Sequence, residues 1–159
     1  MALRPVVHKL ELDVADLDRE RYATYKLVLT REPSEPDERL VARILAFALN
    51  ADEALSFSPA MADTEEPALA QRDLEGRIRL WIEVGAPEPK RLKKAASRAD
   101  AVLLYLYHGR SGRIWWEKNQ PELEAIGKLR VYEFDTDAVN ALALLVETGM
   151  ELACTIQDG

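Results

Sequence analysis

The chain has 159 residues, of which 48% are hydrophobic and 31% charged, and its formal net charge is −7 at pH 7. This length suits a single domain, residues 1–159, with a core that needs neither a disulfide nor a structural metal. The composition is too apolar for disorder, and the one cysteine excludes an internal disulfide or a multi-thiolate zinc site. No stretch approaches the ~20 apolar residues of a membrane helix, and the first residues are not a signal peptide. We therefore expect a cytoplasmic globular protein without membrane contact, and the sequence leaves its oligomeric state open.

The first part of the chain is predicted to form a strand pair followed by a helix. Residues 6–14 and 22–30 alternate between apolar and polar side chains, as antiparallel strands do. Ser34 is the expected N-cap of a helix that runs to about residue 48, because acidic residues and then an apolar stripe follow it. Residues 50–67 show no sustained period and are predicted to be a long surface connection.

The remainder alternates strands with helices. A short apolar piece at residues 68–70 leads to Asp73, and with the tight turn at residues 74–76 and a strand at 77–84 it predicts a hairpin. A helix is expected to begin at Pro87. An almost continuously apolar strand at 101–107 is followed by a helix, a strand, a helix and a strand at residues 114–126, 129–134, 136–146 and 150–156. This order predicts an α/β fold with a mixed central sheet flanked by helices. No glycine-rich phosphate loop opens any of the helices.

Three carboxylates could meet at one edge of that sheet. Asp73 ends one strand of the predicted hairpin, Glu83 lies near the end of the next strand, and Glu38 lies in the first turn of the preceding helix. Gathered carboxylates repel each other unless a cation neutralises them, and oxygen ligands suit Mg²⁺. Spacing alone, however, favours the interpretation that all three are ordinary surface charges.

A basic run over residues 90–98 follows these carboxylates. Such a run is usually the solvated face of an amphipathic helix. With Leu92 as the centre of the buried stripe and 100° per residue, Lys94 points to solvent, whereas Lys93 lies at the boundary. A lysine at the boundary can deliver its ammonium group to a sheet edge, which makes Lys93 the better site candidate.

Several further segments carry a family resemblance. They are Ser34-Glu35 with Glu38-Arg39, Leu45-Ala46-Phe47, Ala51-Asp52-Glu53, Leu80-Trp81-Ile82-Glu83-Val84-Gly85, Lys93-Lys94-Ala95, Ile114-Trp115-Trp116 and Thr155-Ile156-Gln157-Asp158-Gly159. Together they resemble the YaeQ family over the whole chain. Members of that family usually continue beyond the Ile-Gln-Asp-Gly segment with another strand-like stretch, so we expect the C-terminus of this chain to be incomplete.

The resemblance implies a restriction-endonuclease-like core, similar to that of the PD-(D/E)XK nuclease superfamily, with extra strands. That core runs helix, three strands, helix, strand, and periodicity gives a helix followed by strand, turn, strand, helix and strand for residues 34–107. In the superfamily an acidic residue on the first helix, an Asp on one strand and a Glu-x-Lys on the next gather at one edge. Glu38, Asp73 and Glu83 match the three acidic positions. Gly85 stands where the lysine would be, and Lys93 of the following helix could replace it.

Two functions remain open at this point. The first is a Mg²⁺- or Mn²⁺-dependent nuclease that hydrolyses phosphodiester bonds, with Asp73, Glu83 and Glu38 as metal ligands and Lys93 as catalytic lysine. The second is a non-catalytic module that binds nucleic acid or a transcription complex. Residues 72–98 hold eight basic and four acidic side chains, whereas the chain on either side is net acidic. A phosphate-bearing partner would therefore bind at that one basic face.

Overall fold

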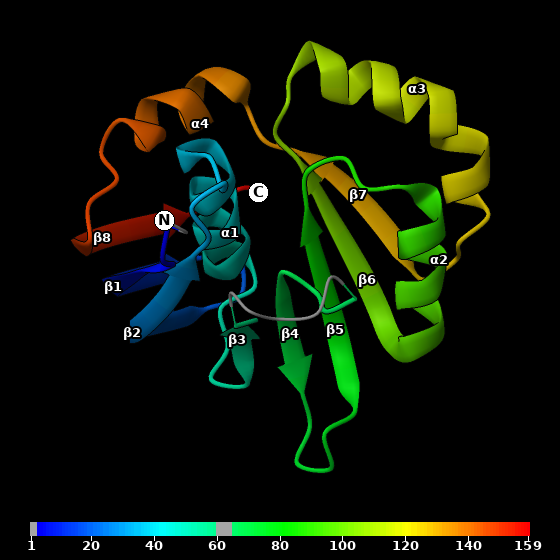
Figure 1. The fold of residues 1–159 in the computed structure, drawn as a ribbon. Helices are drawn as coiled ribbons and strands as arrows, with labels where there is room; N and C mark the ends of the chain where they lie inside the picture. Colours follow the sequence, from blue (N-terminus) through cyan, green and yellow to red (C-terminus); the bar gives the residue numbers. More distant parts are fainter. Residues whose placement is uncertain (1–2, 60–64) are drawn as a thin grey trace.

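The protein is described here by a computed structural model that covers residues 3–59 and 65–159. Within these residues the strands form two mixed sheets (Figure 1). In the small sheet, β1 (Val6–Asp16) pairs antiparallel with β2 (Arg21–Arg31) and parallel with β8 (Gly149–Ile156). The polypeptide thus joins its first and last strands in one sheet.

The large sheet has the strand order β3-β4-β5-β6-β7. Its first three strands pair antiparallel and its last three pair parallel. These strands are β3 (Leu55–Phe57), β4 (Leu69–Arg72), β5 (Ile78–Val84), β6 (Ala99–Leu106) and β7 (Leu129–Glu133). The helices of the described residues are α1 (Asp37–Leu49), α2 (Pro89–Arg98), α3 (Arg110–Glu124) and α4 (Thr136–Ala143).

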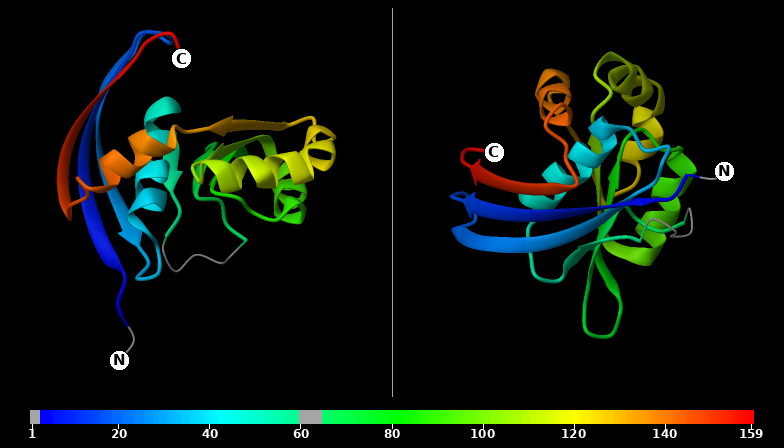
Figure 2. Two further views of the ribbon diagram at one scale, coloured as in Figure 1. Left: turned by 90° about the horizontal axis from the view of Figure 1, so that it is seen from above. Right: turned by 60° about the vertical axis from the view of Figure 1, so that its left-hand side comes forward.

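The elements stack in layers around two hydrophobic cores. Figure 2 shows the small sheet, then α1 and α4, then the large sheet, and finally α2 and α3. The first core lies between the two sheets around α1, and Ile82 and Val84 of β5 pack in it. The second core lies between the large sheet and α2 with α3, and Trp81 packs there against Leu92 and Ala95. Neighbouring residues of β5 therefore face different layers, as the period of two in a strand requires. No helix of the described residues is long and apolar enough to cross a membrane.

The mixed α/β class and the predicted element order are confirmed, with local corrections. Ser34 is not the N-cap, because α1 begins after Pro36, and a residue before proline is biased away from helical geometry. Likewise α2 begins at Pro89 rather than Pro87. The predicted surface connection at 50–67 contains β3, which pairs with β4. Residues 60–64 of that connection lie outside the described residues.

The buried carboxylate of Asp16 at the end of β1 yields a prediction on pH. Burial alone would raise the pKa of Asp16, but hydrogen bonds from the Arg19 backbone and side chain outweigh it and hold this pKa below the usual 3.8. A carboxyl group whose pKa is lower in the folded than in the unfolded state stabilises the fold at pH values above its unfolded-state pKa. This stabilisation is lost as the pH falls through the folded-state pKa. The Tm of wild type should therefore be higher than that of Asp16→Asn at about pH 7. The difference between the two Tm values should shrink as the pH falls toward about 2. A gap in Tm that is constant across this range contradicts the prediction.

Candidate functional site

The structure separates Asp73 from Glu83. Arg72 of β4 pairs with Ile78 of β5, so Asp73 lies at the hairpin end of these strands. Glu83 lies five positions beyond Ile78, which corresponds to roughly 16 Å along the strand. A divalent cation binds oxygens within about 2.6 Å, so these two carboxylates cannot share one ion. The predicted pairing of Asp73 and Glu83 at one edge is therefore not found.

Glu38 lies on the other face of the large sheet. It belongs to the first turn of α1, the helix of the first core. Glu83 faces α2 instead, because its carboxylate accepts hydrogen bonds from Trp81 and from Arg91 of α2. No group of three or more His, Cys, Asp and Glu side chains that could hold a metal occurs within residues 3–59 and 65–159. The three predicted ligands thus lie at three separate places.

Asp73 stabilises the hairpin between β4 and β5. Its Oδ1 accepts hydrogen bonds from the backbone N–H groups of Glu75 and Arg77, at 3.0 and 2.9 Å. Its Oδ2 lies 3.2 Å from Nε of Arg79. Gly76 in the same turn has a φ of 85°, a conformation that glycine adopts most readily. The Asp-x-x-Gly spacing is thus explained by the turn, because an Asp side chain can bond to backbone N–H groups a few residues later.

Lys93 does not approach Glu83, because its ammonium group pairs with Glu122 of α3. The basic residue at Glu83 is Arg91. Leu92 is not the sole centre of the buried stripe, because Ala95 is buried with it. A centre taken between Leu92 and Ala95 leaves Arg91 about 70° away and Lys93 about 130° away, at 100° per residue. The position of Ala95 in the sequence therefore indicates that Arg91, and not Lys93, lies nearer to the buried face of the helix.

Glu83 is 4% exposed, and its Oε1 accepts three hydrogen bonds. Trp81 Nε1 donates at 2.8 Å, and Arg91 donates from Nε at 3.1 Å and from Nη2 at 2.8 Å. The same Nη2 donates to the backbone carbonyl of Glu66 at 2.6 Å. The guanidinium cation of Arg91 therefore already lies between the Glu83 carboxylate and the Glu66 carbonyl. Asp73 and Glu83, the predicted ligands of one Mg²⁺, do not fit a single ion in this arrangement.

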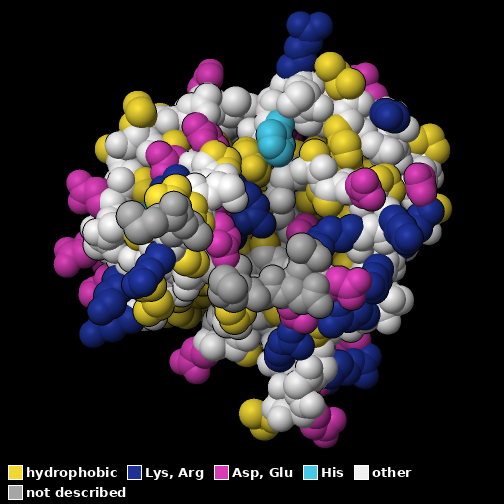
Figure 3. All heavy atoms as spheres, in the orientation of Figure 1, with side chains coloured by type: hydrophobic (Ala, Val, Ile, Leu, Met, Phe, Trp, Pro, Cys, Tyr) yellow, Lys and Arg dark blue, Asp and Glu magenta, His cyan; other side chains and the backbone are white. Residues whose placement is uncertain are grey.

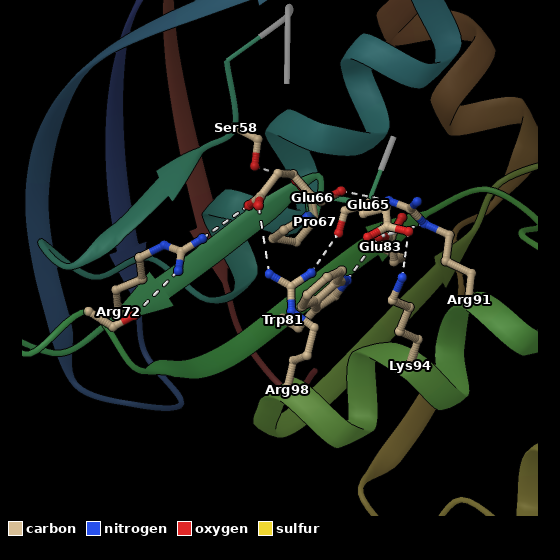
Figure 4. Close-up of polar contacts among 11 residues, drawn as sticks. Ser58, Glu65, Glu66, Pro67, Arg72, Trp81, Glu83, Arg91, Lys94 and Arg98 are labelled. Carbon is tan, nitrogen blue, oxygen red and sulfur yellow. Dashed lines mark hydrogen bonds and ion pairs between the residues drawn. The ribbon is translucent and has the colours of Figure 1, made fainter. Parts of the chain in front are cut away.

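Three cations of α2 form one row, which we call the α2 stripe: Arg91, Lys94 and Arg98. Their spacing of i, i+3 and i+7 places them on one side of the helix. Lys94 pairs with the Glu65 carboxylate. Arg98 donates to the Glu65 carbonyl at 3.0 Å and lies over the Trp81 ring, 5.1 Å from its centroid. Figure 4 shows the stripe directed at the chain that enters β4.

Arg72 of β4 completes this cationic surface from the opposite side. Its Nη2 donates to the Glu66 carboxylate at 3.1 Å, and that carboxylate also lies 3.7 Å from Nη2 of Arg98. A hollow of about 440 Å³ adjoins the stripe. It is lined by Glu65, Trp81, Pro87, Glu88, Lys90, Arg91, Lys94 and Ala95. In Figure 3 Lys and Arg side chains gather over α2 and the β4–β5 hairpin, with acidic side chains between them.

Two mixed sheets packed around α1 and bordered by the cationic helix α2 make this a mixed α/β protein. The family model described as YaeQ protein matches residues 1–159, the whole chain. The chain therefore belongs to the YaeQ family.

Relatives of this chain agree in sequence and in fold. The uncharacterised YaeQ protein of Escherichia coli strain K12 is 38% identical over 159 residues, which are all of this chain and 88% of the relative. The crystal structure of the YaeQ protein from Xanthomonas axonopodis pv. citri superposes with a TM-score of 0.93 at 40% identity, over 98% of this chain and 88% of that one. The YaeQ crystal structure from Pseudomonas syringae gives 0.92 at 32% identity, over 98% and 86% of the two chains.

Proposed function

We propose that this protein binds nucleic acid without cleaving it, and that the α2 stripe and Arg72 hold backbone phosphates. One observation carries the proposal: four cationic side chains from two elements meet on one surface, and all of them bind oxygens. Arginine forms its strongest hydrogen bonds with carboxylate and phosphate oxygens. Contacts to backbone phosphates supply most of the nonspecific affinity for nucleic acid.

The order of elements supports a nuclease-like scaffold beneath this surface. From α1 to β6 the chain runs helix, three strands, helix, strand. The three strands pair antiparallel, and β6 then adds in parallel to β5. This is the order that the family resemblance implies for the PD-(D/E)XK superfamily core.

The environment of Glu83 supports binding rather than hydrolysis. Its Oε1 is taken by Arg91 and Trp81, and Gly85 stands at the position of the superfamily lysine. A buried carboxylate bound to arginine is electrically compensated without a metal. Under this proposal Glu83 positions Arg91, whose Nη2 donates to the carbonyl of Glu66 in the segment before β4.

Metal-dependent hydrolysis is the second candidate, favoured by the same order of elements. The expected metal-binding carboxylates do not converge, so we assign no catalytic step to them. A binding assay separates the two candidates. A fluorescent DNA or RNA oligonucleotide should bind in EDTA and remain intact after addition of Mg²⁺ or Mn²⁺. Cleavage that requires the metal would overturn the proposal, and so would the absence of any binding.

A thermal-shift titration gives an independent prediction for the metal. A ligand that binds only the native state raises Tm by mass action. We expect Mg²⁺ and Mn²⁺ at about 1–10 mM to change the Tm of wild type and of Glu83→Gln equally, because Arg91 already neutralises Glu83. Each variant is compared with itself in EDTA. A rise in Tm that is present in wild type and lost in Glu83→Gln would show a metal site at Glu83.

A further inference from the structure

Two consecutive acidic residues, Glu65 and Glu66, lie across the α2 stripe, and we call them the acidic strap. The Glu65 carboxylate pairs with Lys94, and its carbonyl accepts from Arg98 at 3.0 Å. The Glu66 carboxylate lies between Arg72 and Arg98, at 3.1 and 3.7 Å. The strap therefore supplies side-chain or backbone oxygens to all four cations of the proposed phosphate-binding surface (Figure 4).

The strap is held in place by its neighbours on the C-terminal side. The Ser58 hydroxyl donates to the Pro67 carbonyl, and Pro67 favours an extended conformation for Glu66 before it. Leu69, two residues after Pro67, begins the pairing of β4 with Ile82 of β5. The strap thus stands at a fixed position beside α2.

The ion pairs of the strap are accessible to solvent. The side chains of Glu65 and Lys94 are 53% and 52% exposed, and those of Glu66 and Arg98 are 32% and 37% exposed. Pairs of this kind contribute little net stability, because both partners are well hydrated when apart. A polyanion with several phosphates can therefore replace the strap carboxylates without disrupting the fold.

We propose that the acidic strap is an autoinhibitory contact, in which its two carboxylates compete with phosphates for Lys94, Arg98 and Arg72. The inference rests on the proposed function, because it regulates the same surface. It accounts for the coexistence of a cationic row and its neutralising acids on one face. Nucleic acid binds only as the carboxylates leave, so the strap lowers the affinity of every strand that occupies these cations.

The test compares two variants that change the net charge equally. Glu65→Gln with Glu66→Gln removes the strap charges but keeps side-chain size. Glu11→Gln with Glu151→Gln removes two exposed charges from facing positions on β1 and β8, in the small sheet on the far side of the molecule. Affinity for a fluorescent DNA strand is measured by anisotropy in EDTA at several salt concentrations. We expect the strap variant to bind roughly ten-fold more tightly than wild type, and the control to bind within about two-fold of it.

The outcomes separate the inference from the proposed function. If wild type binds and the strap variant binds no more tightly than the control, the inference is overturned and the proposed function stands. If neither wild type nor the strap variant binds, both are overturned. Binding by the strap variant alone supports the inference, whereas the missing wild-type binding contradicts the proposed function. Circular dichroism verifies folding, and Glu65→Gln alone provides the same comparison with one charge removed.

Discussion

Replacement of Arg43 by Met should lower the free energy of unfolding by about 3–5 kcal/mol, because the buried carboxylate of Glu35 loses its buried cation and keeps only the partly exposed Arg39. The side chains of Arg43 and Glu35 are 4% and 6% exposed. Arg43 donates from Nε to Glu35 Oε1 at 2.8 Å and from Nη2 to Oε2 at 2.9 Å. Its Nη2 also lies 3.2 Å from the Thr30 carbonyl of β2, so the pair joins α1 to the small sheet. Urea unfolding followed by circular dichroism measures the change.

Two variants of the same network serve as controls. Arg39→Met removes a partner of Glu35 that is 36% exposed, and this should cost less than about 1 kcal/mol. Glu35→Gln combined with Arg43→Met should cost less than Arg43→Met alone, since no uncompensated charge remains. If the single Arg43→Met costs no more than Arg39→Met, the buried pair does not contribute as described.

The second large effect concerns the α2 stripe. Lys94→Gln with Arg98→Gln should weaken binding of duplex DNA by roughly ten- to hundred-fold at low salt and reduce the salt slope by about two. For each cation that is removed, one phosphate of the DNA keeps its counterion when the protein binds. Fewer counterions are therefore released, and binding depends less on salt. Trp81 and Leu92 remain in the core, so the fold should be retained. Anisotropy titrations at several salt concentrations give both quantities.

The matched control for this variant is Lys9→Gln with Lys26→Gln. Both lysines are exposed on the small sheet, and the change in net charge is the same. The control should retain wild-type affinity within about two-fold, because screening at moderate salt removes the influence of distant charges. An equal loss in both variants would mean that net charge, and not the α2 stripe, determines binding.

Much of the fold was predictable because hydrophobic periodicity reports which face of an element is buried. The alternation in β1 and β2 gave their antiparallel pairing, and the apolar run of β6 gave a strand covered on both faces. β3 was missed because three residues are too short to display a period. The start of α1 was displaced because Ser34 has the chemistry of an N-cap, while Pro36 sets the backbone.

The site was predicted less well, because its geometry depends on contacts distant in sequence. Asp73 belongs to a turn, and its position relative to Glu83 follows from the register of β4 and β5. Charge counting along the chain also overstated the basic character of residues 72–98. The fold brings acidic side chains from outside that stretch to its cations, namely Glu65, Glu66, Asp100 and Glu122. The net charge counted over residues 72–98 is therefore more positive than the charge of the surface that these residues form.

The salt dependence of nucleic-acid binding by the wild-type protein in EDTA tests the central claim most directly. Neutralised phosphates release counterions, with a slope of log K against log salt of about −0.9 for each phosphate on duplex DNA. The α2 stripe and Arg72 predict measurable binding with a slope of about −2 to −4, without any divalent cation. The claim is contradicted by a slope near zero, or by binding that occurs only when Mg²⁺ or Mn²⁺ is present.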